Sequence, residues 1–244
     1  MSHFIVIVTG TEKQSVESQL VPFDENHSVP AYDRECFCIG NVARRDAREQ
    51  ADKELDFDIQ KVRDAYWKLP EDERTDAKWK ELTKEHSDLV DKLEAAHPLN
   101  GKPDPKCDEC HGSGTYESQY NPDSKWDWYE VGGRWGGYFQ LKAGAESEQV
   151  LSAHYSETED DVLKRQQENK SDVAKVMDID FETMGDKIVP FAILHNGHWY
   201  ERGSMGWWGM VSDEKDEDEW KTKVMELLKG LDPEVELSAV DCHI

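Results

Sequence analysis

The sequence has few basic side chains and no long apolar segment. Its 29 Lys and Arg residues stand against 53 Asp and Glu residues, so the formal charge at pH 7 is -24. A field of this sign repels nucleic acid and anionic membranes, and we expect the protein to bind neither directly. No apolar run approaches the roughly 20 residues that span a membrane. The opening MSHFIVIVTG lacks the basic start and cleavage site of a secretory signal, which favours the cytoplasm.

The chain also lacks the short motifs that identify common enzymes. It contains no Walker loop and no H-E-x-x-H, and GGRWGG at residues 132–137 lacks the strand–loop–helix context of a dinucleotide-binding loop. Acids, bases and a nucleophile are present, but no spacing among them matches an activated triad or a carboxylate pair: His195, His198, Glu201, Asp127, Cys242 and His243. The sequence therefore assigns no catalytic residue.

The acidic surplus has two interpretations. The extra Asp and Glu residues can simply solvate the surface, or they can imitate a phosphate backbone and attract a basic surface on a partner protein. Two acidic runs, ETEDD at residues 157–161 and DEKDEDE at residues 213–219, are the candidate contacts in the second case. Binding through them is expected to weaken as salt rises.

The five cysteines form two close pairs and one single residue, Cys242. Cys36 and Cys38 lie in ECFCIG, and Cys107 and Cys110 lie in CDECHGSG. Close pairs of thiols in an intracellular chain favour a metal over disulfides. The spacing C-x-x-C-x-G-x-G allows a tight turn in which two thiolates face one tetrahedral ion. This knuckle resembles half of the zinc repeat in the J-domain co-chaperones.

A closed structural zinc site needs four ligands, so the knuckle must find two more. Cys36 and Cys38 are the first candidates, which predicts a Zn2+ site of Cys36, Cys38, Cys107 and Cys110. A variant that includes His97 or His111, and a chain without metal, remain as alternatives. The chain also contains a helical insertion, called the arm below, and zinc at this position is expected to join its base to the rest of the fold, called the body.

Apolar patterns predict an α+β body with a helical insertion. A buried strand, HFIVIVTG, and a short helix open the chain, and a helix and a strand, PEVELSAVDCHI, close it. Two strand segments between them complete the order β-α-β-β-α-β, the ferredoxin-like antiparallel sheet with two helices on one face. The predicted body covers residues 1–40 and 121–244, with a polar, mobile insertion at 143–186. Residues 41–120 form the arm, a helical hairpin with the zinc knuckle.

The two central strand segments are unusually rich in tryptophan. They are WDWYEVGGRW at 126–135 and HNGHWYERGSMGWWGM at 195–210. They contain six of the nine tryptophans, and one of them carries the Asn196-Gly197 hairpin turn. Indoles can cover the second face of a sheet, which is one interpretation. The other is a ligand face, because aromatic rings stack planar bases and arginine grips phosphate. Its candidate residues are Trp128, Arg134, Trp135, His195, His198 and Arg202.

Several stretches together carry a wider resemblance. They are PFDEN at 22–26, the knuckle leading into YNPDSKWDWYEVGGRWGGYF at 120–139, RGSMGWWG at 202–209 and the terminal VDCHI. They resemble a family of accessory proteins encoded by bacteriophages. The resemblance implies a non-virion role in the cytoplasm of an infected bacterium, and it supplies no reaction. With the charge, it predicts a zinc-stabilised protein that modulates a host protein with a basic surface. The alternative is a protein that binds or processes a small nucleotide.

Overall fold

The computed structural model describes residues 2–10, 15–145, 147–154, 156–206 and 209–244, and it divides into two compact units. The body consists of Met1–Val29 and Tyr120–Ile244, and the arm consists of Pro30–Gln119. Residues 30–40, predicted to be part of the body, belong to the arm. They do so because β2 (Tyr32–Glu35) pairs with β3 (Thr115–Ser118), where the chain enters and leaves the arm.

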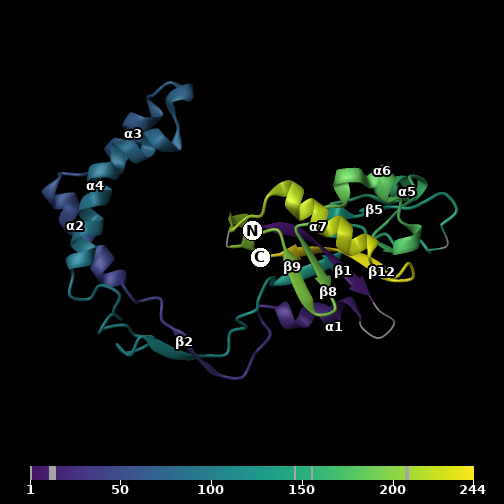
Figure 1. Cartoon of the computed structure of the whole chain (residues 1–244), viewed down its shortest axis with the longest axis horizontal. Coiled ribbons are helices and arrows are strands. Elements are labelled where there is room, and N and C mark those ends of the chain that lie inside the picture. Colours follow the sequence, from purple (N-terminus) through teal and green to yellow (C-terminus); the bar gives the residue numbers. More distant parts are fainter. Residues whose placement is uncertain (1, 11–14, 146, 155, 207–208) are drawn as a thin grey trace. The chain divides into compact units, whose positions relative to one another are not determined.

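The body is built on one sheet with the strand order β4-β12-β1-β8-β9. These strands are β4 (Trp128–Val131), β12 (Glu236–His243), β1 (His3–Gly10), β8 (Ala192–His195) and β9 (His198–Glu201). The short β7 (Val173–Lys175) adds to β12. The first strand therefore lies at the centre, next to the last one, and Figure 1 shows β1 and β12 in the body.

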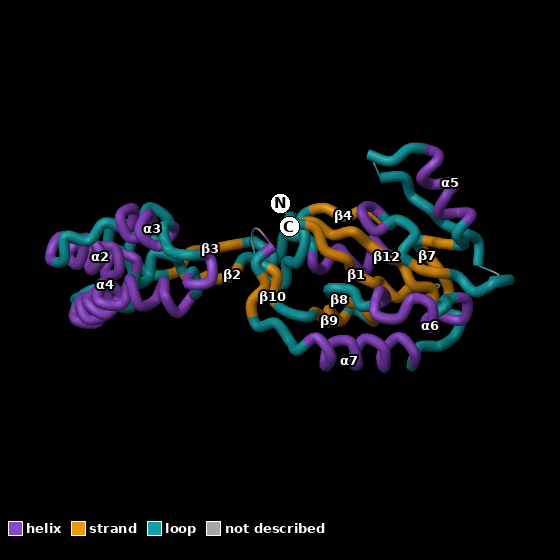
Figure 2. The backbone as a smooth tube through the Cα atoms, turned by 90° about the horizontal axis from the view of Figure 1, so that it is seen from above, coloured by secondary structure: helices purple, strands orange, loops and turns teal. Residues whose placement is uncertain are grey.

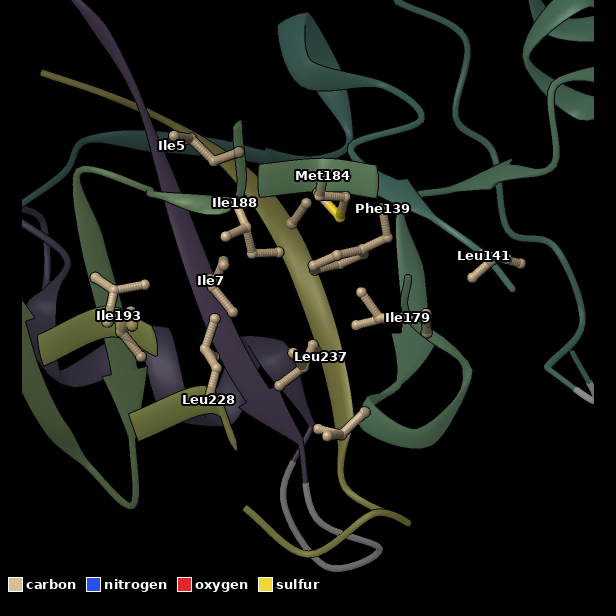
Figure 3. Packing of buried hydrophobic residues seen from close by; sticks show 14 of the residues in the cluster. Ile5, Ile7, Phe139, Leu141, Ile179, Met184, Ile188, Ile193, Leu228 and Leu237 are labelled. Atoms are coloured by element: carbon tan, nitrogen blue, oxygen red, sulfur yellow. The ribbon is translucent and has the colours of Figure 1, made fainter. Parts of the chain in front are cut away.

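Both faces of this sheet are buried. Phe4, Val6 and Val8 of β1 pack in one cluster with Leu20 of α1 (Val16–Leu20). The alternate residues Ile5 and Ile7 pack in a second cluster with α7 (Glu217–Lys229), as Figure 3 shows in part. A strand that is apolar at every position suits a sheet covered on both sides, because its side chains alternate between the faces.

The mixed α+β class is confirmed, but the arrangement differs from the predicted ferredoxin-like one. β1 pairs antiparallel with β12 and parallel with β8, so the sheet is not purely antiparallel. α1 and α7 pack on opposite faces of the sheet instead of one. The prediction made the two tryptophan-rich segments the middle strands and expected them to lie close together. In the structure β4 instead joins β12 at one edge, and the hairpin of β8 and β9 forms the other edge.

The polar insertion at 143–186 contributes to the α7 side of the core. It contains α5 (Glu159–Gln167), β6 (Lys170–Ser171) and α6 (Phe181–Met184), and β6 pairs with β5 (Phe139–Gln140). Ile179 and Met184 are buried in the same cluster as the α7 residues. Part of this segment is therefore packed, in contrast to the mobile insertion expected from its polarity.

The arm holds α2 (Asn41–Glu54), α3 (Ile59–Trp67) and α4 (Asp76–Ala96), drawn as coils in Figure 2. The helical spacing of Leu55, Ile59, Val62 and Tyr66 predicts one helix of the hairpin, and the pattern after Pro70 predicts the other. In the structure the principal partner of α4 is α2, whose Ala47 and Ala51 pack against Val90. Alanines allow two helices to approach closely, but they give a weak signal in an apolar pattern.

Candidate functional site

The structure brings together the sulfurs of all four cysteines predicted as metal ligands. The Sγ atoms of Cys36, Cys38, Cys107 and Cys110 all lie within 4.8 Å of one another. Cys36 and Cys107 are 3.6 Å apart, and Cys38 and Cys110 are 3.5 Å apart. A tetrahedral ion with bonds of about 2.3 Å holds its sulfurs about 3.8 Å apart. None of the cysteines forms a disulfide, and the group could coordinate one metal ion.

Two tight turns aim these thiols at a common point. In the knuckle, Gly112 and Gly114 have φ of 84° and 87°, conformations that favour glycine. A Cβ on Gly112 would lie 3.3 Å from the backbone of Pro105, so the turn is also closely packed. The second half of the site has its own turn, since Gly40, two residues after Cys38, has φ of 78°. The C-x-C-x-G spacing of ECFCIG is the signal in the sequence for this turn.

The thiols of the cluster differ in pKa. Burial opposes ionisation of Cys110, but hydrogen bonds from the backbone of Gly114 and Gly112 and from the thiol of Cys38 outweigh it and lower its pKa to about 6. Burial raises the pKa of Cys38 to about 12, against a hydrogen bond from the Asp104 N–H. The cluster thus favours one thiolate even without a cation, and a divalent ion would stabilise the others as thiolates.

The histidine alternatives lie outside this cluster. His97 accepts a hydrogen bond from the Leu99 N–H at Nδ1, and its Nε2 lies 3.7 Å from Asp46. Among the described residues, the metal-ligating group consists of cysteines only. All four belong to the arm, so the expectation that the metal pins the arm to the body is wrong. The two pairs meet because the strands β2 and β3 run side by side up to them.

The predicted ligand face is divided between the two edges of the body sheet. Trp128 lies on β4 and Arg134 in the 3-10 turn that follows it, Gly133–Trp135. His195 and His198 lie on β8 and β9 beyond β12 and β1, and neighbouring strands are about 4.8 Å apart. The expected single cluster is therefore not formed. The sequence could not reveal this, because it depends on which strands pair.

Of the six tryptophans in the two tryptophan-rich segments, most of those that the structure describes serve the core, as the covering interpretation expects. The Trp126 indole is buried and donates to the Leu20 carbonyl, and Trp135 packs against the α7 cluster. On the other edge, Trp199 is half-buried and donates to Glu201. Trp128 is the exception, with 47% of its surface exposed. The remaining two, Trp207 and Trp208, lie outside the described residues.

The glycines of GGRWGG make room for buried charged groups. A Cβ on Gly132 would lie 2.4 Å from an Asp172 oxygen, and one on Gly133 would lie 2.6 Å from Asp241. On Gly136 it would collide with the Arg165 guanidinium. Asp172 accepts hydrogen bonds from the backbone of Gly137 and Ser152, and burial raises its pKa. The loop thus wraps around fixed side chains instead of a cofactor.

Two histidines that the sequence analysis did not include as ligands lie beside Trp128 and Arg134. His3 and His243 face each other across β1 and β12, with ring centroids 5.0 Å apart. The His3 ring packs edge-on against Trp128 at 6.1 Å. The Arg134 backbone N–H donates a hydrogen bond to the Asp241 carboxylate, and the same carboxylate is hydrogen-bonded to His3 Nδ1. Little in the sequence indicates that these two histidines lie together, because they are 240 residues apart and meet only when the first and last strands pair.

The other predicted residues have local partners. His195 Nδ1 lies 2.9 Å from the Thr9 hydroxyl, and burial lowers the pKa of His195, with a contribution from the charge of His198. Arg202 pairs with Glu214 at 2.7 Å. The exposed Arg134 guanidinium has no hydrogen bond or ion pair to any residue in the described part of the chain. Arg134 is therefore the candidate cation that is free to bind a ligand.

The arm contains a groove of about 570 Å³, a size suited to small ligands. α2, α3 and α4 contribute its lining, and the Phe57 and His86 rings stack inside it with centroids 3.9 Å apart. His86 also bonds Asp52 at 2.8 Å. Arg48 lines the groove from α2 and has no ion pair to any other described residue. No sequence motif indicated this groove.

No protein-family model matches the chain, and comparisons with curated proteins and with solved structures give no match either. Within the described residues, no helix has both the length and the apolar character needed to cross a membrane. The site therefore has to be interpreted from its own geometry and chemistry.

Proposed function

We propose that this protein is a zinc-binding bacteriophage accessory protein that binds a basic surface on a host protein in the bacterial cytoplasm. The observation that supports zinc is the cluster of four sulfurs within 4.8 Å of one another. Four thiolates in a closed tetrahedral set are a donor group that zinc prefers, and such sites are usually structural. The metal would then order the arm, and the acidic surface would bind the partner.

Metal analysis tests the first part of this proposal. Protein purified without chelators should contain close to one zinc per chain, and Cys36→Ser or Cys110→Ser should lower that content. Cys242→Ala is the control, because Cys242 is buried in the core of the body and is not one of the four clustered cysteines. Protein without zinc, or equal zinc in all three variants, would refute the assignment.

The negative charge is concentrated in the body. The body has 31 acidic and 14 basic side chains, a formal charge of -17, and the arm accounts for the remaining -7. Some of the acidic residues serve the fold: Asp216 caps α7, and Asp161 forms a capping box with Thr158 on α5. The exposed acids next to these caps are the candidate contacts for a basic partner, because a surface field steers association.

Charge reversal tests the partner surface without disturbing the caps. The body variant combines Glu159→Lys, Asp160→Lys and Glu217→Lys, and the control reverses three acids of the arm at residues 71–73. We expect a host protein captured by the wild-type chain to be lost only with the body variant. Its binding should also weaken steeply as salt rises, since the Debye length falls to about 3 Å at 1 M. Equal capture by both variants would exclude these contacts.

A second candidate function is the binding of a small nucleotide at Trp128 and Arg134. It is favoured by the exposed Trp128 ring and by the Arg134 guanidinium, which no described residue pairs. A base can stack on the indole, and the guanidinium can grip a phosphate. Arg134→Lys should weaken nucleotide binding with little change in stability. If Arg48→Ala weakens it instead, the ligand binds in the arm groove.

A further inference from the structure

The strand ends beside Trp128 hold two histidines that are each oriented by a carboxylate. His3 Nδ1 lies 2.8 Å from Asp241, and His243 Nδ1 lies 2.5 Å from Asp127. The carboxylates fix the rings with Nδ1 as the donor, which leaves the Nε2 atom of each ring available. Two such pairs lie side by side, because His3 and His243 are directly opposite in the ladder of β1 and β12.

Both rings are held firmly and are only partly exposed. The side chains of His3 and His243 are 13% and 12% exposed, and Asp241 is fully buried. Asp241 cannot move away, since Gly133 packs against it and the Arg134 N–H donates to it at 3.0 Å. The orientation of His3 is therefore coupled to the loop that carries Arg134. A positioned imidazole of this kind is the usual proton donor or acceptor in enzymes.

The surrounding charges differ for the two histidines. His3 faces the buried Asp241, and the Arg134 loop covers the same carboxylate. His243 faces Asp127, and Glu25 lies near both of these groups. Burial raises the pKa of Glu25, and the charges of Asp127 and Asp24 raise it further, while His243 lowers it. His243 therefore has two carboxylates near it, Asp127 and Glu25, whereas His3 faces the single carboxylate of Asp241, and on this difference in surroundings we assign the role of proton donor to His243.

We propose that His3 and His243 form a general base and general acid pair that cleaves a phosphodiester in a small ribonucleotide. The proposal rests on nucleotide binding at Trp128 and Arg134, the second candidate function. Cys242 is not the nucleophile, because it is fully buried on the opposite face of the sheet. The 2′-hydroxyl of the substrate fills that role, so the reaction needs no further reactant.

The reaction is an internal transesterification. His3 Nε2 takes the proton of the 2′-hydroxyl, and the O2′–phosphorus bond forms as the phosphorus–O5′ bond breaks. His243 gives its Nε2 proton to the leaving O5′, so the products are a 2′,3′-cyclic phosphate and a free 5′-hydroxyl. Arg134 offsets the charge that develops on the phosphate. Water returns the proton from His3 to His243, and the enzyme is restored.

The acidic body determines the size of the substrate. A chain of -24 repels an extended polyanion, whose binding depends on many contacts with basic side chains. One phosphate between two nucleosides needs only Arg134 and one imidazolium. The substrate class is therefore a dinucleotide or a cyclic oligonucleotide, and not polymeric RNA.

The test uses the full chain and uridylyl-3′,5′-adenosine as the probe, with chromatography of the cyclic phosphate product. His3→Gln and His243→Gln should each lower kcat by about 100-fold or more, the usual contribution of a general acid or base. Binding of the probe, measured by tryptophan fluorescence, should persist in both variants. The control is His198→Gln, at the opposite edge of the sheet, which should keep full activity. The 2′-deoxy probe should bind without being cleaved.

The pH profile and Asp127 provide further readouts. The rate should pass through a maximum with pH, because one imidazole must be neutral and the other protonated. Asp127→Asn should lower kcat and alter this profile with little change in KM, since Asp127 acts only by positioning His243. Cleavage that survives in both histidine variants, or binding without cleavage in the wild-type chain, would overturn the proposal. If the probe does not bind at all, the second candidate function falls as well.

Discussion

Removal of the metal should unfold the arm and leave the body intact. All four thiol ligands belong to Pro30–Gln119, and none is in the sheet of the body. The arm has a small apolar core, in which Val90 packs against two alanines of α2. Burial of a valine is worth about 1.5–3 kcal/mol, whereas structural zinc contributes about 10–16 kcal/mol in small domains. The metal is therefore the largest single stabilising term that we expect for the arm.

Hydrogen exchange with mass spectrometry measures this prediction. After chelation, peptides from α2 and α4 should lose protection, while peptides from β1 and β12 should keep it. Cys110→Ser should have the same effect without chelator. In Cys242→Ala, the arm peptides should keep the hydrogen-exchange protection that they have in the wild-type chain. Arm peptides that stay protected after zinc is lost would refute this reasoning. Equal loss in the body would show that the two units unfold together.

Three further predictions concern the body. Gly133→Ala should lower the thermal stability of the protein by more than Gly197→Ala. Both glycines have positive φ, but a Cβ would collide with Asp241 at Gly133 and would meet nothing at Gly197. Trp220→Ala should cost about 3–5 kcal/mol in chemical denaturation, and Trp128→Ala clearly less, because Trp220 is 1% exposed and Trp128 is 47% exposed. Hydrogen bonds from the Thr158 backbone and hydroxyl lower the pKa of Asp161, so the α5 cap should still be intact at the usual Asp pKa of about 3.9. It should be lost only as the pH falls further, through the lowered pKa, as followed by NMR.

The outcome for Trp128 changes an expectation from the sequence. As part of an indole cover on the sheet, Trp128 would be buried. The structure exposes it at the end of β4 and gives the structural role to Trp126 and Trp220, which are buried and donate to backbone carbonyls. Tryptophan content alone cannot separate these cases, because burial of an indole depends on which segment covers it.

The cluster of four cysteines was the most predictable part of the molecule. A knuckle with Cys107 and Cys110 needs a second pair of ligands, and Cys36 and Cys38 are the only other close pair of thiols. The ligand set follows from this chemistry with little knowledge of the fold. The unit that holds it was less predictable, since the pairing of β2 with β3 decides that the site belongs to the arm.

The sequence by itself determined the local elements and the chemistry of the thiols. The continuous apolar run of β1, the amphipathic α7 and the turn at Asn196-Gly197 are encoded within a few residues of each other. Only the tertiary structure decided the strand order, and with it the separation of His195 from Arg134 and the meeting of His3 with His243. The physical reason is that strand pairing between distant segments depends on the whole buried core, because backbone hydrogen bonds alone do not select a partner.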